Sequence, residues 1–160
     1  MKYWKVLFVK PRAEKKVTLF CKLFNIPFYL PLREKTRVVQ RRRITIKLPV
    51  FPGYVFARLD AHQRLELLQT NLLVRVLEPD NPRPLLRNLI MVRRALRVNP
   101  ALEPEQPLIK GRLVRIMSGP FMGVEGRVTR IAGKMKVVLN VDLIGRAVSV
   151  TAEISQIEAL

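Results

Sequence analysis

The distribution of glycine divides this sequence into two unlike halves. Six of the seven glycines lie between Gly111 and Gly145, and only Gly53 lies outside that stretch. A glycine inside a helix costs about 1 kcal/mol relative to alanine, so this density disfavours a long helix in the second half. Short alternating or apolar runs lie between the glycine-containing segments: RLVRIM, EGRVTRI, KVVLNVDL and AVSVTA. We therefore predict that residues 107–160 form a small five-stranded β-barrel, which leaves few open strand edges.

The first half predicts a mixture of strands and helices. YWKVLFVK, GYVFARL and LLVRVLE are short runs typical of strands, whereas Val17, Phe20, Cys21 and Phe24 recur at helical spacing. AHQRLELLQ and PLLRNLIMVRRALRV are further predicted helices. The order of these segments indicates an antiparallel sheet with helices packed against it. The predicted fold class of the chain is therefore α+β.

A proline-rich stretch separates the two halves. NPALEPEQP, residues 99–107, contains three prolines and no glycine. Proline removes a backbone donor and restricts the chain to extended forms, which is typical of a semi-rigid linker. We predict a first domain over residues 1–98, a linker over residues 99–106 and a second domain over residues 107–160.

The charge is strongly positive and unevenly distributed. The 160 residues carry a formal net charge of +18, and residues 1–98 contain 22 Lys and Arg against 6 Asp and Glu. Such an excess favours nucleic acid or an anionic membrane as the partner. No apolar run approaches the roughly 20 residues of a membrane span, and no signal-peptide cleavage site follows the start. We expect a cytoplasmic protein that binds nucleic acid and not a membrane.

No pattern in the sequence indicates catalysis, a metal or a cofactor. One cysteine, Cys21, and one histidine, His62, cannot form an ordinary zinc site or a disulfide framework. The glycines at positions 119, 123 and 126 lie between two predicted strands, a context that does not fit a nucleotide-binding loop. No Ser/His/Asp arrangement or carboxylate pair suggests acid–base chemistry. We expect that the chain is not an enzyme.

The segment from residue 33 to residue 47 contains seven cations and one acid. Because alternate residues of a strand face opposite ways, the consecutive Arg41, Arg42 and Arg43 cannot all face one side of a regular strand. We expect them at a hairpin tip or on a strand edge. Contact with phosphate is one interpretation, and a charged edge that prevents aggregation is the other. The predicted nucleic-acid contacts are Arg33, Lys35, Arg37, Arg41, Arg42 and Arg43.

An aromatic segment follows this basic segment almost directly. Phe51, Pro52, Gly53 and Tyr54 belong to PVFPGYVF, in which Tyr54 and Phe56 share one face of a predicted strand. These aromatic residues either pack in the core or form part of an interface, where Tyr and Phe are enriched. The residues alone leave both interpretations open.

Several of these segments together resemble the NusG family of transcription elongation factors. They are WKVLFVKPRAEKKV, LPVFPGYVFARL, and KGRLVRIMSGPFMGVEGRVTRI followed by VVLNVDLIGRAVSV. The last of them is similar to the KOW motif through Gly111, Val114, Ile116, Gly119, Gly123, Gly126 and Val128. The KOW motif alone also occurs in ribosomal proteins. The resemblance covers nearly the whole chain in the right order.

The resemblance implies a NusG-like N-terminal domain, a KOW barrel and a set of partners. NusG-like proteins bind the clamp helices of RNA polymerase through an apolar aromatic surface and suppress pausing. It implies polymerase contacts at Phe8, Phe51, Pro52, Gly53 and Tyr54. It also implies that Phe121 and Met122 lie in the KOW loop through which relatives contact the termination factor Rho or a small-subunit ribosomal protein.

The strong charge, the proline-rich linker and the arginine-rich RNLIMVRRALRV segment depart from a housekeeping NusG. They are more similar to specialised paralogues such as RfaH, LoaP and the capsule-operon regulators. We expect an antitermination factor that binds polymerase and nearby DNA or RNA. The alternative is a ribosome-associated KOW protein that binds RNA, and the Phe51/Tyr54 surface distinguishes the two, because a ribosomal protein has no need of a polymerase-binding surface.

Overall fold

The computed structural model describes all residues from Met1 to Leu160, and the chain divides into two compact units. The first unit comprises Met1–Pro31 and Phe51–Leu86, and the second comprises Leu32–Val50 and Arg87–Leu160. None of the three α-helices has the length and hydrophobicity that a membrane span requires. The chain combines helices with antiparallel sheets, so the predicted α+β class is confirmed.

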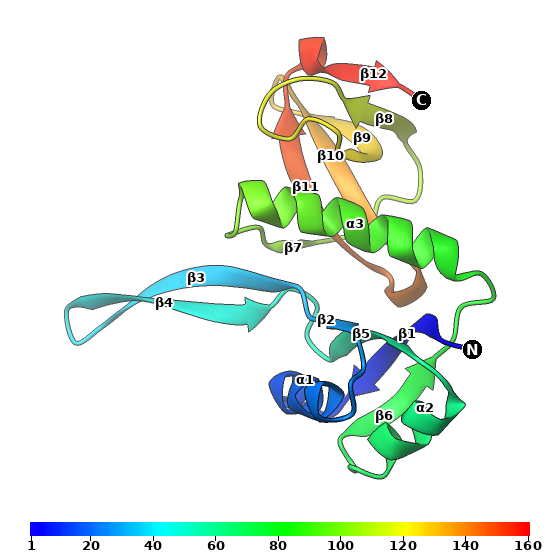
Figure 1. Cartoon of the computed structure of the whole chain (residues 1–160). Coiled ribbons are helices and arrows are strands. Elements are labelled where there is room, and N and C mark those ends of the chain that lie inside the picture. Colours follow the sequence, from blue (N-terminus) through cyan, green and yellow to red (C-terminus); the bar gives the residue numbers. More distant parts are fainter. The chain divides into compact units, whose positions relative to one another are not determined.

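The first unit is built on a four-stranded antiparallel sheet (Figure 1). Its strands are β1 (Tyr3–Val9), β2 (Phe28–Tyr29), β5 (Tyr54–Leu59) and β6 (Leu73–Leu77), in the order β2-β5-β1-β6. Strand β1 pairs with β5 from Tyr3↔Leu59 to Phe8↔Tyr54. The apolar run at the start of the sequence therefore becomes a central strand, as expected for a segment without a regular polar side.

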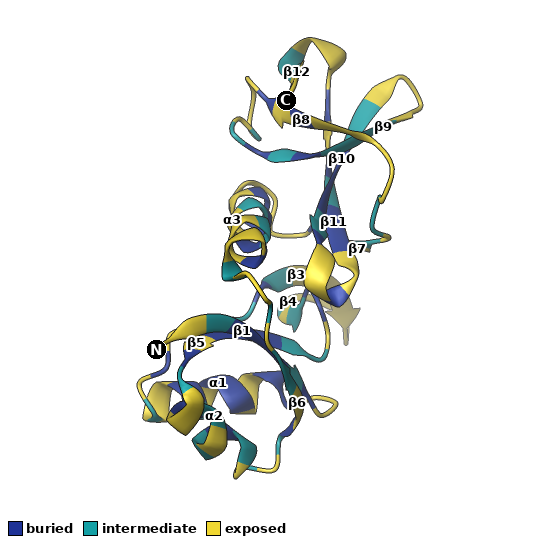
Figure 2. Ribbon diagram, turned by 90° about the vertical axis from the view of Figure 1, so that its right-hand side faces the viewer, coloured by how far each residue is buried: buried dark blue, intermediate teal, exposed yellow.

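Helices α1 (Glu14–Leu23) and α2 (Ala61–Leu68) pack against one face of this sheet and bury it. Val17 and Cys21 of α1 pack with Leu7, Val55 and further apolar residues of the sheet. The outer residues of both helices are exposed (Figure 2). The helical stripe that the sequence predicts is thus a core stripe, although Phe20 and Phe24 are only partly buried.

Local signals in the sequence explain where these helices begin and end. Asp60 caps α2 by accepting a hydrogen bond from the backbone N–H of Gln63 at 2.8 Å, and the side-chain Oε1 of Gln63 accepts one from the backbone N–H of Asp60 at 3.1 Å. The bond from Gln63 lowers the pKa of Asp60 below its ordinary value. Helix α1 ends before Asn25, which has a φ of 58°, a conformation that asparagine tolerates better than most residues.

The second unit contains a β-hairpin, the greater part of a long helix and a larger sheet. The hairpin pairs β3 (Leu32–Val39) with β4 (Arg42–Pro49) as a separate two-stranded sheet. Helix α3 (Pro82–Val98) begins with a proline, which has no N–H to leave unpaired in a first turn.

The larger sheet has six strands in the order β12-β8-β9-β10-β11-β7. These are β7 (Pro104–Glu105), β8 (Arg112–Ile116), β9 (Glu125–Ile131), β10 (Lys134–Val141), β11 (Arg146–Ala152) and β12 (Ile157–Ala159), with single 3-10 turns at η1 (Asp142–Ile144) and η2 (Ile154–Gln156). The predicted strands of the second half are confirmed. Gly126 allows β9 to lie close to its neighbour β10, because a Cβ at this position would lie 2.5 Å from the carbonyl oxygen of Val138.

The prediction of a closed five-stranded barrel needs a correction. Strands β8 to β12 supply the five expected strands, but β11 and β12 do not pair, so the sheet stays open. The other edge of β11 is covered by β7, in which Pro104 lies opposite Val148 and Glu105 opposite Ala147. The proline-rich stretch that the sequence indicates as a linker therefore supplies a sixth strand.

Polar contacts hold β7 on the sheet. Glu105 forms an ion pair with Lys136 of β10 and accepts a hydrogen bond from the hydroxyl of Ser149 at 3.3 Å. The hydrogen bond from Lys136 is the main cause that lowers the pKa of Glu105 below its ordinary value of 4.5. A group with a lowered pKa in the folded state stabilises that state above its unfolded pKa, and this contribution is lost as the pH falls through the lowered value.

We predict that β7 stays paired with β11 near neutral pH and loosens as the pH falls below 4.5, through the lowered pKa of Glu105. Hydrogen exchange at the amides of residues 104–106 and 146–149, measured over an acid pH series, checks this. In Glu105→Gln the exchange should lose this pH dependence, whereas Glu103→Gln should behave like the parent. An NMR titration in which Glu105 titrates at its ordinary value would contradict the prediction.

Candidate functional site

The structure brings together the predicted aromatic residues Phe8 and Tyr54 on the sheet of the first unit. They lie opposite each other on β1 and β5, and their ring centroids are 5.4 Å apart with the planes tilted by 41°. Leu7 and Val55 are paired in the neighbouring position and point to the helix-covered core. Because side chains alternate along a strand, the Phe8–Tyr54 pair lies on the other face of the sheet.

The predicted Gly53 positions this pair. Its φ is +91°, and a Cβ at this position would lie 3.4 Å from the ring of Phe8. Its carbonyl oxygen accepts a hydrogen bond from the backbone N–H of Val9 at 2.8 Å. The positive φ would strain any larger residue here, whereas the distance to the Phe8 ring alone would only be an ordinary van der Waals contact.

The five predicted polymerase contacts differ in exposure. Pro52 is exposed, and Phe8, Gly53 and Tyr54 are half-buried. Phe51 is 1% exposed and lies in the core. The accessible aromatic surface therefore consists of Phe8 and Tyr54, and a contact through Phe51 stays a prediction that would require the side chain to become accessible.

Arg75 is a neighbour that the sequence did not indicate. It lies opposite Phe8 in the register of β1 and β6, and its guanidinium carbon is 5.9 Å from the centroid of the Phe8 ring. This is the range of a cation–π interaction. Only the pairing of two strands that are far apart in sequence reveals the contact.

The arginine triplet lies at the tip of the hairpin, as predicted. Gln40 and Arg41 form the two-residue turn with φ values of 49° and 64°, and Arg42 and Arg43 begin β4. Positive φ at both central residues is the conformation of the turn that suits the twist of a hairpin. Arg42 lies opposite Val39 and Arg43 opposite Val38, so these two arginines point to opposite sides of the ribbon.

Phe121 and Met122 lie together in the loop between β8 and β9. Met122 is 68% exposed, and Phe121 is half-buried. Gly119 and Gly123 have φ values of 87° and 91°, and the N–H of Gly123 donates to the carbonyl oxygen of Ile116 at 2.8 Å. The glycines thus fold the loop tightly and leave Met122 accessible.

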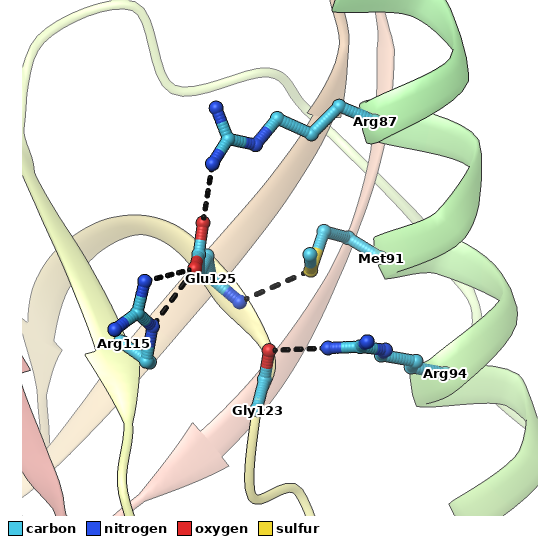
Figure 3. A network of polar contacts seen from close by, with 6 residues as sticks. All are labelled: Arg87, Met91, Arg94, Arg115, Gly123 and Glu125. Atoms are coloured by element: carbon cyan, nitrogen blue, oxygen red, sulfur yellow. Dashed lines mark hydrogen bonds and ion pairs between the residues drawn. The ribbon is translucent and has the colours of Figure 1, made fainter.

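One face of α3 contacts the end of this loop (Figure 3). Arg94 donates through Nη1 to the carbonyl oxygen of Gly123 at 3.0 Å, and the N–H of Glu125 lies 3.3 Å from the Sδ of Met91. Arg87 lies 3.6 Å from Glu125, which also pairs with Arg115 at 2.7 Å. The high arginine content of α3 was visible in the sequence. The contact of Arg94 with Gly123, in a loop about 30 residues away, was not.

The structure offers little for metal-binding or thiol chemistry. It contains no group of three or more His, Cys, Asp or Glu side chains that could hold a metal ion. Cys21 is buried, and burial raises the pKa of its thiol to about 11, so the thiolate that reacts or binds metal is scarce at neutral pH. The accessible features are an aromatic pair, a basic hairpin and an exposed loop.

The chain thus combines a helix-covered four-stranded sheet with a larger, open six-stranded sheet. Residues 2–96 match the family model described as "Transcription termination factor nusG", and residues 110–140 match the one described as "KOW motif". The chain belongs to the NusG family, whose members are transcription termination and antitermination factors and not enzymes.

The chain is also similar to the transcription termination/antitermination protein NusG of Staphylococcus carnosus (strain TM300). The two sequences are 28% identical over 170 residues, which cover 95% of this chain and 88% of the relative. The resemblance found in the sequence is confirmed at the level of the family.

We predict that Glu125→Gln lowers the free energy of unfolding of the chain by about 1 kcal/mol, because Arg115 and Arg87 lose their common anionic partner. Hydrogen exchange should also become faster in residues 118–124. Chemical denaturation and exchange measurements check both expectations. Glu103→Gln, at an exposed residue that forms no ion pair, is the matched control and should have no effect. Equal behaviour of the two variants would show that the network is not stabilising.

Proposed function

We propose that this protein is a transcription elongation and antitermination factor that binds RNA polymerase and the nucleic acid close to it, and so suppresses pausing or termination. The observation that carries the proposal is the half-exposed Phe8–Tyr54 pair on the sheet face opposite the helical core. Membership of the NusG family supplies the context.

The polymerase-binding role is assigned to the aromatic surface of Phe8, Gly53 and Tyr54. Aromatic side chains bring a large apolar area at low entropic cost, and Tyr is enriched among the residues that dominate binding energy. The proposed partner is the clamp-helix region of polymerase, as the resemblance implies. This surface also favours a polymerase-binding factor over a ribosome-associated KOW protein.

Two further surfaces complete the proposal. The hairpin contacts nucleic acid through its cations, supported by the net charge of +18. The exposed Met122 and its neighbour Phe121 form a contact for Rho or a small-subunit ribosomal protein. The protein acts in the cytoplasm, and its charge is more similar to that of an operon-specific paralogue than of a housekeeping factor.

We expect Tyr54→Ala and Phe8→Ala each to weaken binding to core RNA polymerase by about 2 kcal/mol, the size of a hot-spot loss, while the fold persists. Titration against labelled polymerase and thermal unfolding check this. Tyr3→Ala is the control, because Tyr3 is an exposed tyrosine on β1, the strand of Phe8, and this variant should bind like the parent. Phe51→Ala should instead lower stability by about 3 kcal/mol, because it empties a core position.

Parent-like binding by folded Tyr54→Ala and Phe8→Ala would contradict the assigned surface. A loss of binding in Tyr3→Ala of the same size would show that the effect is not specific to this face of the sheet.

A further inference from the structure

We infer that the β3–β4 hairpin binds double-stranded DNA by laying one defined side of its ribbon in the major groove. The inference rests on the proposed function, because it names the ligand of the hairpin that the proposal assigns to nucleic acid. It adds the strandedness of the ligand, the groove and the side of the ribbon that faces it.

The register of the hairpin sorts its side chains into two sides. Residues directly opposite each other share a side, and the pairs run without a break from Leu32↔Pro49 to Val39↔Arg42. The basic side, as we call it, carries Arg33, Lys35, Arg37, Val39, Arg42 and Ile44 among its residues. The mixed side carries Glu34, Thr36, Val38, Arg43, Thr45 and Lys47.

Charge is concentrated on the basic side. It has four cations and no acid, whereas the mixed side has Arg43 and Lys47 against Glu34. Lys35, Arg37 and Arg42 are exposed, and none of them forms an ion pair within the chain. A charge that serves only to protect a strand edge has no reason to be concentrated on one side of the ribbon.

Arg33 differs from the other three cations. It is half-buried at the base of the hairpin, and its Nε atom is buried without a hydrogen-bond partner. The backbone N–H of the next residue, Glu34, donates to the carbonyl oxygen of Pro100 at 2.7 Å. The base is therefore engaged within the protein, and the accessible part of the basic side extends from Lys35 to the turn.

The dimensions of the ribbon suit the major groove of B-form DNA. This groove is about 12 Å wide and admits a two-stranded β-ribbon, whose strands lie about 4.8 Å apart. Alternate residues of a strand are about 7 Å apart, so Lys35, Arg37 and the cross-strand Arg42 form a row of cations along the groove. Double-stranded RNA does not offer this fit, because its major groove is deep and narrow.

The apolar residues of the basic side also suit a groove. Val39 is 42% exposed and Ile44 is 39% exposed, and both lie beside the exposed arginines. A thymine methyl group offers an apolar contact in the major groove, and one arginine can donate two hydrogen bonds to the O6 and N7 atoms of a guanine. A single strand would require stacking on aromatic side chains, and residues 32–49 contain none.

The two neighbouring arginines provide a matched test. Arg42 lies on the basic side and Arg43 on the mixed side, and both are exposed, so Arg42→Ala and Arg43→Ala remove the same charge one residue apart. The full chain is titrated by fluorescence anisotropy against a labelled 20-base-pair DNA duplex, one of its single strands and the duplex RNA of the same sequence. Circular dichroism checks that each variant is folded.

We expect Arg42→Ala to weaken duplex DNA binding about tenfold, which corresponds to loss of one good groove contact, and Arg43→Ala to weaken it less than about twofold. Arg37→Ala should resemble Arg42→Ala. The parent should prefer the DNA duplex to the single strand and to duplex RNA. Methyl green, which occupies the major groove, should compete with the protein, and netropsin, which occupies the minor groove, should not.

Equal losses in Arg42→Ala and Arg43→Ala, tighter binding to the single strand or to RNA, or competition by netropsin would overturn the inference. These outcomes are separable from failure of the proposed function, because Tyr54→Ala should keep full affinity for the duplex while it loses polymerase. A protein that suppresses pausing but shows no difference between the two arginine variants would refute the groove assignment alone. If Arg42→Ala unfolded, Arg37→Ala against Arg43→Ala would decide the question.

Discussion

The antiparallel pairing of β1 with β5 is the constraint on which the first unit depends. It places Leu7 opposite Val55 on the helix-covered face and Phe8 opposite Tyr54 on the other. A shift of one residue would exchange the two faces, so the same apolar pattern that builds the core also fixes which aromatic residues are accessible. Gly53 allows the turn that leads into β5, because its φ of +91° is a conformation that other residues adopt only with strain.

The alternation of side chains along a strand also organises the hairpin, but here it separates charged residues rather than buried apolar ones. Eight residue pairs hold the ribbon in one register and separate a basic side from a mixed side. Strand register thus fixes both the accessible Phe8–Tyr54 pair and the basic side of the ribbon, which we propose as the contacts for polymerase and for nucleic acid. A factor that must contact polymerase and the nucleic acid that polymerase holds needs both properties close together along the chain.

Much of this was predictable because it depends on local periodicity. The spacing of Val17 and Cys21 indicated a helix that buries that stripe, and the three consecutive arginines indicated a hairpin tip or a strand edge, of which the structure shows the tip. Features that depend on distant pairing were not predictable. Strand β7 is too short and too rich in proline to carry a strand pattern, and it forms because β11 offers an open edge. The burial of Phe51 and the contact between Arg94 and Gly123 likewise depend on residues remote in sequence.

On our proposal the aromatic face and the basic hairpin act together on the transcribing polymerase. Hydrogen-exchange footprinting of the chain, alone and bound to a reconstituted elongation complex, tests whether both segments are engaged. We expect slower exchange in two segments at once, the β1 and β5 strands around Phe8 and Tyr54 and the hairpin from Lys35 to Ile44. Protection confined to the KOW strands, with both of these segments unchanged, would contradict it.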